Sequence, residues 1–89
     1  MNHFKLTISS PDGNVFSGDV TDLFVRGSEG DLAVLAGHIP FITSLKPGVI
    51  RFTLADEALT ENSAEIDGGL LTVGSDSVTL LCGQFKKNH

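Results

Sequence analysis

The stretch 27–48 places side chains able to do chemistry close to defined turns. It holds two carboxylates, Glu29 and Asp31, near one turn and a histidine, His38, near the next. The other two histidines lie at or near the chain ends, where a fixed catalytic geometry is not expected. Taken singly, His38 fits a turn residue bonded to the backbone, and Glu29 and Asp31 fit solvated loop charges. We therefore predict no catalytic residue.

The turns also fail to match the known loops for metals and phosphate. No His-x-x-x-His or Cys-x-x-Cys spacing occurs, so the usual ligands of a zinc site are missing. Asp12, Asn14 and Asp19 lack the regular spacing and the terminal glutamate of a calcium-binding loop. The glycines of 27–48 precede short apolar runs, and not a helix whose N-terminus could hold phosphate. We predict no metal, no cofactor and no enzymatic activity, with a small hydrolase dependent on His38 as an alternative.

The composition is typical of a single acidic globular domain. The chain has 89 residues, 40% of them hydrophobic, and a formal net charge of −5. This charge repels phosphate backbones, so nucleic acid is not an expected partner. No apolar run approaches the roughly 20 residues that span a bilayer, and the N-terminus does not resemble a secretory signal. The single cysteine, Cys82, excludes an internal disulfide and favours the reducing cytosol.

Apolar and polar residues alternate with a period of two along most of the chain, which predicts strands. The expected strands are 4–8, 15–16, 19–26, 32–36, 39–45, 49–54, a polar edge strand ending near Ile66, 70–73 and 78–82. Turn residues such as Pro-Asp-Gly, Lys-Pro-Gly and Asp-Gly-Gly separate them. We therefore predict an all-β fold, a flattened antiparallel β-sandwich or barrel of about ten short strands.

Several details of this pattern need the structure to resolve them. Gly18 is expected to interrupt the second strand, and the runs 32–36 and 39–45 are expected to form a packed hairpin. Leu23 and Phe24 cannot both face one side of a regular strand, so we expect a β-bulge or a strand covered on both faces. Cys82 alternates with apolar residues and is expected in the core. The segment 55–66 is read as a loop before a polar strand, and 83–89 as a short tail.

Taken in order, these features resemble one known family. The run 27–51, Gly-Ser-Glu-Gly-Asp-Leu-Ala-Val-Leu-Ala-Gly-His-Ile-Pro-Phe-Ile-Thr-Ser-Leu-Lys-Pro-Gly-Val-Ile-Arg, closely resembles the signature of the epsilon subunit of F-type ATP synthases. Its most specific part is Gly37-His38-x-Pro40 followed by Leu45-Lys46-Pro47-Gly48. The segments 15–19, 68–73 and 78–81 match in the same order. The resemblance covers nearly the whole chain.

The resemblance implies a fold and a place in a complex. The family's N-terminal domain is a β-sandwich of about ten strands at the foot of the central stalk. It binds the gamma subunit and touches the polar loops of the membrane c-ring. Positions matching Ser10, His38 and Thr43 lie towards gamma, and the loop matching Glu29-Gly30-Asp31 faces the ring.

The family's function follows from that place. The subunit is non-catalytic and helps to couple proton- or ion-driven rotation to ATP synthesis. By resemblance we expect a monomer when isolated, one copy per complex, and a peripheral location on the cytoplasmic face of the bacterial cell membrane.

Two departures from the family pattern affect these expectations. Family members usually continue as a C-terminal helical hairpin, which in many of them inhibits ATP hydrolysis, whereas this sequence ends at His89. We therefore expect a sandwich domain over 1–85, a short tail over 86–89 and no C-terminal helical domain. The segment 55–66 is longer and more polar than the usual hairpin there, so its conformation does not follow from the resemblance.

A different reading of the same residues is a free-standing β-sandwich adaptor or carrier domain that binds another protein. A lipoyl or biotinyl carrier would display a lysine at a hairpin tip. Lys46 precedes Pro47 in a turn but lacks the flanking Asp or Met of those carriers. A mass shift on Lys46 in the native protein would support this alternative.

Overall fold

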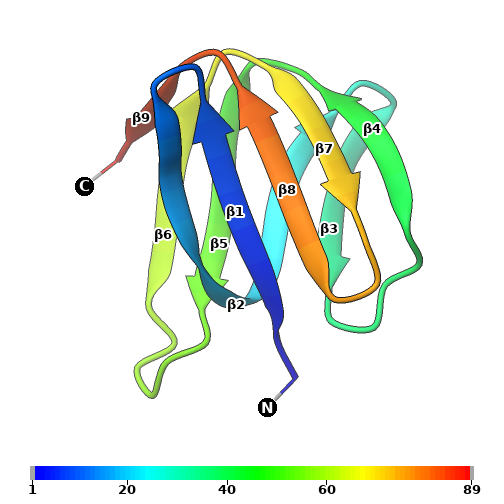
Figure 1. Cartoon of the computed structure of the whole chain (residues 1–89), viewed down its shortest axis with the longest axis vertical. Coiled ribbons are helices and arrows are strands. Elements are labelled where there is room, and N and C mark those ends of the chain that lie inside the picture. Colours follow the sequence, from blue (N-terminus) through cyan, green and yellow to red (C-terminus); the bar gives the residue numbers. More distant parts are fainter. Residues whose placement is uncertain (1, 89) are drawn as a thin grey trace.

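The fold is built from nine strands in the part of the chain that the computed structural model describes, residues 2–88 (Figure 1). In chain order they are β1 Phe4–Ser10, β2 Gly13–Gly27, β3 Gly30–Leu35, β4 Phe41–Leu45, β5 Gly48–Leu54, β6 Glu61–Ile66, β7 Gly69–Val73, β8 Ser77–Cys82 and β9 Phe85–Lys87. No helix occurs among these residues. The predicted all-β class is confirmed.

The strands form two layers that share β2. In one layer β4, β7, β8, β1 and the first half of β2 are neighbours, and in the other β3, the second half of β2, β5, β6 and β9 are neighbours. All pairs are antiparallel except β1 with β8, which is parallel. Figure 1 shows the first layer in front and the second behind it. This is the predicted sandwich, with one parallel pair added.

The long strand β2 differs from the expected pair of short strands. It runs unbroken through Gly18, and its first part pairs with β1 while its second part pairs with β3 and β5. The register shifts between Val20 and Asp22, which is the expected bulge. Beyond it Leu23 is fully buried and Phe24 is 44% exposed, so the two residues face opposite sides. One bent strand replaces two of the nine expected strands, and β9 within the expected tail brings the count in the described residues back to nine.

The expected hairpin of β3 with β4 is wrong. β3 pairs with β2, whereas β4 pairs with β7 in the other layer. The connection between them includes Gly37, with a φ of 84°, and Pro40, which lacks an N–H donor. This connection therefore carries the chain from one layer to the other.

The two segments with weak sequence patterns also take defined structure. The loop 55–60 precedes β6, which pairs with β5, so the expected loop and polar strand are both present. Within the expected tail, Phe85–Lys87 forms β9 against Ala64–Ile66. β6 is therefore covered along part of its outer side. His89 lies outside the described residues.

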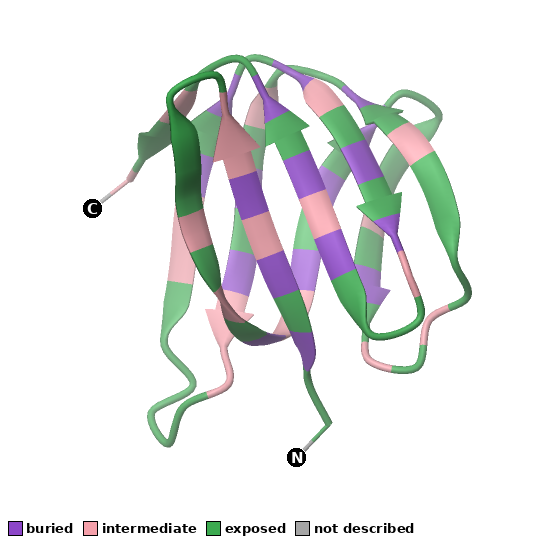
Figure 2. Ribbon diagram, viewed as in Figure 1, coloured by how far each residue is buried: buried purple, intermediate pink, exposed green. Residues whose placement is uncertain are grey.

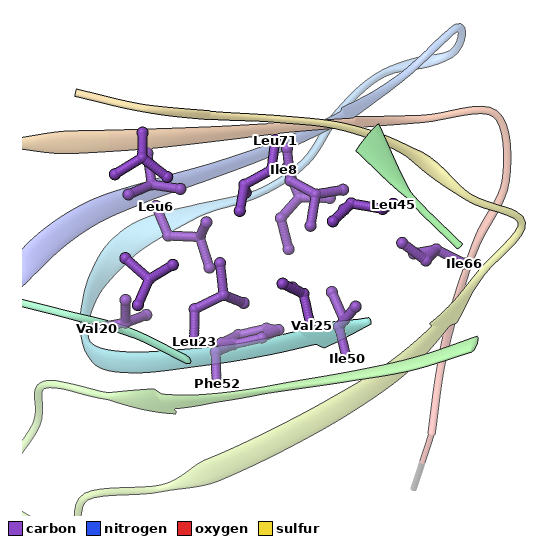
Figure 3. Close-up of a cluster of buried hydrophobic side chains, with 14 of the residues drawn as sticks. Leu6, Ile8, Val20, Leu23, Val25, Leu45, Ile50, Phe52, Ile66 and Leu71 are labelled. Atoms are coloured by element: carbon purple, nitrogen blue, oxygen red, sulfur yellow. The ribbon is translucent and has the colours of Figure 1, made fainter. Parts of the chain in front are cut away.

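The core lies between the two layers (Figures 2 and 3). Buried residues alternate with exposed ones along most strands, as the period of two predicts. The buried apolar side chains are Phe4, Leu6, Ile8, Val20, Leu23, Val25, Val34, Leu45, Ile50, Phe52, Ala64, Ile66, Leu71, Val73, Val78, Leu80 and Cys82. The expected core position of Cys82 is confirmed.

Cys82 should behave as an inert thiol. Burial raises the pKa of its thiol, the carboxylate of Asp67 raises it further, and its Sγ lies 3.6 Å from the oxygen of Ser9. The folded state then keeps a proton that the unfolded chain loses above about pH 8.5, so stability should fall above that pH. We expect urea unfolding to show this fall in the wild type and a smaller one in Cys82→Ala. An equal fall in both proteins would contradict the assignment.

Candidate functional site

The residues selected from the sequence lie at opposite ends of the sandwich. The turn with Glu29 joins β2 to β3 at the end where β1 also turns into β2 (Figure 1). The segment 36–40 with His38 joins β3 to β4 at the other end. Since β3 separates the two, they cannot form one catalytic site. They could instead contact two different partners.

The Glu29 turn is exposed and carries negative charge. The Nε of Arg26 lies 3.4 Å from the Oδ1 of Asp31, and their side chains are 56% and 78% exposed. Such an exposed ion pair contributes little to stability. The N–H of Ser28 donates to the oxygen of Ser44 at 2.9 Å, which ties the turn to β4. The turn is therefore anchored at its base while the carboxylate of Glu29 remains open to solvent.

His38 links the 36–40 connection to a neighbouring turn. Its Nδ1 lies 2.6 Å from the oxygen of Leu35, and its Nε2 lies 2.5 Å from the oxygen of Gly74 before β8. The neutral ring can donate to one of these oxygens, and the imidazolium can donate to both. The ring of Phe4 packs edge-on against the His38 ring, with 5.4 Å between the two ring centroids. His38 is thus bonded to backbone, the ordinary role considered from the sequence.

Replacing His38 by alanine should loosen this connection. The change removes contacts to two carbonyl oxygens and the Phe4 packing, so we expect a loss of about 1–3 kcal/mol in unfolding free energy. Amide hydrogen exchange over 36–40 should become faster than in the wild type. His3→Ala, which removes a surface contact of 3.8 Å between Nε2 of His3 and Oδ2 of Asp19, should cost about 0–1 kcal/mol. Equal costs for the two changes would contradict a linking role.

Ser10, His38 and Thr43 do not come together in one patch. Ser10 ends β1, where its Oγ accepts the N–H of Asp12 at 3.3 Å. Thr43 lies in the middle of β4 opposite Leu71 and is half-buried. Because β1 and β8 run parallel, Ser10 lies beside the end of β8, whereas His38 is bonded at its beginning. Any surface that includes all three residues must extend along the whole front layer.

The outer side of that front layer carries a feature that the sequence patterns did not reveal. The register aligns two rows across five strands: Ile42, Thr72, Thr79, Thr7 and Ser17 in one, and Ser44, Leu70, Leu81, Ser9 and Asn14 in the other. We call these rows the uncharged face. None of their residues carries a charge, and three apolar ones are exposed, namely Ile42 at 68%, Leu70 at 41% and Leu81 at 46%.

The uncharged face has the character of an interaction surface. The chain as a whole is 19% charged with a net charge of −5. Interface cores are depleted in charged residues, and exposed apolar groups surrounded by polar ones mark contact sites. The apolar signal in the sequence was spread over separate strands. Only the strand pairing brings Leu70 next to Leu81.

The opposite face has a groove of about 540 Å³ lined by residues that include Phe24, Arg26 and Arg51. Its charges are mixed, since Arg26 pairs with Asp31 and Glu61 lies with Arg51 along an adjoining pocket. We therefore assign no anion site there.

Residues 2–88 bring together no three His, Cys, Asp or Glu side chains able to hold a metal ion. They also contain no helix of the length and apolarity needed to cross a membrane.

Comparison with known proteins identifies the family. The model of the family "ATP synthase, Delta/Epsilon chain, beta-sandwich domain" matches residues 3–88. The chain belongs to this family. The delta/epsilon sandwich accounts for the nine-stranded fold, and its match includes the run 27–51 that carried the resemblance in sequence.

Solved structures of similar fold come from larger assemblies. A chain of the Euglena gracilis mitochondrial ATP synthase, in a structure of OSCP, F1 and c-ring, superposes with a TM-score of 0.88 at 24% identity over 98% of this delta/epsilon chain. A chain of the Tetrahymena thermophila mitochondrial ATP synthase central stalk and c-ring gives 0.79 at 14% identity over 92%. This chain spans 54% and 64% of their respective lengths. At these identities the likeness shows a shared fold.

Proposed function

We propose that this chain is a rotor subunit in the central stalk of an F-type ATP synthase, where it couples proton- or ion-driven rotation to ATP synthesis. The observation that carries the proposal is the delta/epsilon family match over residues 3–88. Structures of similar fold come from an F1/c-ring assembly and a central stalk/c-ring assembly, which supports the same role. The proposed subunit is non-catalytic and sits peripherally at the membrane, on the cytoplasmic side in a bacterium, because it contacts the c-ring.

The gamma subunit is the proposed partner of the uncharged face. An apolar patch of Ile42, Leu70 and Leu81, surrounded by hydroxyl groups, suits a stable protein contact because little charge must be desolvated. Ser10 borders one end of this face, and His38 lies beyond the other. Thr43 lies on the same strand as Ile42 but is half-buried, so Ile42 offers the larger contact area.

The Glu29-Gly30-Asp31 turn is the proposed contact with the polar loops of the c-ring. It projects from one end of the sandwich, its side chains are exposed, and its base is anchored by Ser28 and Ser44. Charges at the rim of an interface contribute orientation and association rate more than affinity. Two partners at two places would allow a stiff sandwich to transmit torque between them.

Co-purification with the gamma subunit of the same complex tests the proposal. Leu70→Lys places a charge on the uncharged face, and Val49→Lys places the same charge at a similarly exposed residue on the opposite face. We expect the wild type and Val49→Lys to retain gamma and Leu70→Lys to lose at least about tenfold in affinity. Both variants should melt like the wild type, since 41% and 44% of these side chains are exposed.

A second pair of variants tests the ring contact. Asp31→Lys combined with an Ile42→Trp change should weaken assembly with both gamma and the c-ring, while Asp31→Lys alone should leave gamma bound. Failure of the wild type to co-purify with gamma would overturn the proposed function. Unchanged co-purification of every variant would overturn the assignment of the two surfaces.

A further inference from the structure

Strand β3 has one side that no other strand covers in the described structure. It pairs with β2 alone, from Gly30 to Leu35 (Figure 1). The N–H of Lys46 donates to the oxygen of Arg26 at 2.8 Å, so the backbone groups of Arg26 point to β4 and away from β3. By alternation, Val25 and Leu23 point to β3 and bond Leu32 and Val34 opposite them.

The same alternation leaves a row of free backbone groups on the other side. The N–H and C=O groups of Asp31 and Ala33 and the N–H of Leu35 point outward, because the residues between them point to β2, whereas the C=O of Leu35 already contacts the Nδ1 of His38 at 2.6 Å. Backbone groups of an edge strand form a template for a further strand. This edge offers three residues in regular extended conformation, with no register shift along the pairing with β2.

The usual means of protecting an edge are missing from β3. Its sequence, Gly-Asp-Leu-Ala-Val-Leu, has no proline or lysine, and its single charge, on Asp31, pairs with Arg26. The opposite edge of the same layer is β9, which is three residues long and contains Lys86 and Lys87. The short length of β9 and its lysines protect that edge from pairing with a further strand. The two edges of this layer therefore differ in their openness to another strand.

Exposed apolar side chains lie at one end of the open edge. Leu35 at the end of β3 is 55% exposed, Ile39 in the following connection is 82% exposed, and Phe41 at the start of β4 is 38% exposed. Ile42 comes next and belongs to the uncharged face. The segment that follows the open edge therefore leads along the chain to the surface proposed to bind gamma. At its other end lies Glu29, an exposed negative charge.

We propose that an extended segment of the gamma subunit adds to β3 as a further strand. Its backbone bonds the outward groups of Asp31 and Ala33 and the N–H of Leu35, since only an extended chain satisfies such a row. The apolar flank selects a segment with apolar residues near Leu35 and Ile39, and Glu29 beyond the opposite end stays with the proposed c-ring contact. The identity of this partner rests on the proposed stalk function.

A proline at position 33 tests the added strand. Ala33→Pro removes an N–H that the fold does not use, and proline is accepted on an edge strand where its nitrogen faces solvent. Ala33→Thr changes the same exposed side chain and keeps the N–H. With the cognate gamma subunit co-expressed, we expect Ala33→Pro to lose at least about tenfold in affinity and Ala33→Thr to bind like the wild type. Circular dichroism and melting temperature check that both fold.

Hydrogen exchange on the wild-type complex gives an independent readout. The amides of Asp31, Ala33 and Leu35 should exchange at least about tenfold more slowly with gamma bound than in the free chain. Unchanged exchange there, or equal gamma binding by the proline and threonine variants, would overturn strand addition alone. Absence of gamma binding by the wild type would overturn the stalk function and, with it, this partner. If Ala33→Pro instead abolished self-association of the free chain, the edge would serve a second copy and the proposal would be wrong.

Discussion

Gly69→Ala is expected to unfold the domain. A Cβ atom at Gly69 would meet the backbone of Leu81 on the neighbouring strand β8, with the carbonyl oxygen and carbon both at or within 3.0 Å of it. The obstacle is backbone in a paired strand, so no side-chain rotation can relieve it. We expect a loss of about 4 kcal/mol or more, which is most of the stability of about 5–15 kcal/mol typical of a small domain.

Gly30→Ala is the matched control for this change. Gly30 has a φ of 134°, which disfavours alanine, but nothing lies within 4 Å of an added Cβ. It should therefore cost about 1–2 kcal/mol, from backbone conformation without a clash. Thermal melts followed by circular dichroism should show Gly30→Ala folded at 25 °C and Gly69→Ala without a cooperative transition. Similar melting temperatures would contradict the close approach of β7 and β8.

Leu23→Ala is expected to remove about 2–5 kcal/mol of stability. Leu23 is fully buried just after the bulge in β2, where it lies between Val34 of β3 and Phe52 of β5. Truncation leaves a cavity at the point where β2 passes into the second layer. The strands on both sides limit how far the core can collapse to fill it.

The adjacent residue gives the control. Phe24→Ala removes a larger side chain that is 44% exposed on the outer face, so it should cost about 0.5–1.5 kcal/mol in spite of its size. Urea unfolding of both variants measures the difference in midpoint at constant slope. An equal or larger cost for Phe24→Ala would mean that Phe24, and not Leu23, faces the core.

The consecutive residues Leu23 and Phe24 show how much of the strand structure a sequence pattern can predict. Their succession predicted a bulge or a doubly covered strand, and the bulge between Val20 and Asp22 confirms the first option. The pattern could not say which side chain faces inward. That choice depends on pairing with β3 and β5, whose residues are distant in sequence, because a shift by one residue reverses both faces.

The strand partners of β3 and β4 could not be predicted from local sequence patterns either, because they too depend on residues distant in sequence. Two apolar runs joined by a short turn fit a hairpin equally well as two strands in separate layers. Gly37 and Pro40 predict a turn, but the layer to which β4 belongs is decided by its pairing with β7 some thirty residues later in the chain. The uncharged face could not be predicted from the sequence for the same reason, since its rows form only when five strands are aligned.

The sequence by itself therefore determined the all-β class, most strand positions, the core position of Cys82 and the family. Those features rest on local alternation, turn residues and an ordered motif, all of which can be read along the chain. The tertiary structure alone decided that Glu29 and His38 lie at opposite ends, that His38 is held by two carbonyl oxygens, and that β3 keeps an open edge. These depend on long-range strand register, because the backbone hydrogen bonds that set it join residues the sequence keeps far apart.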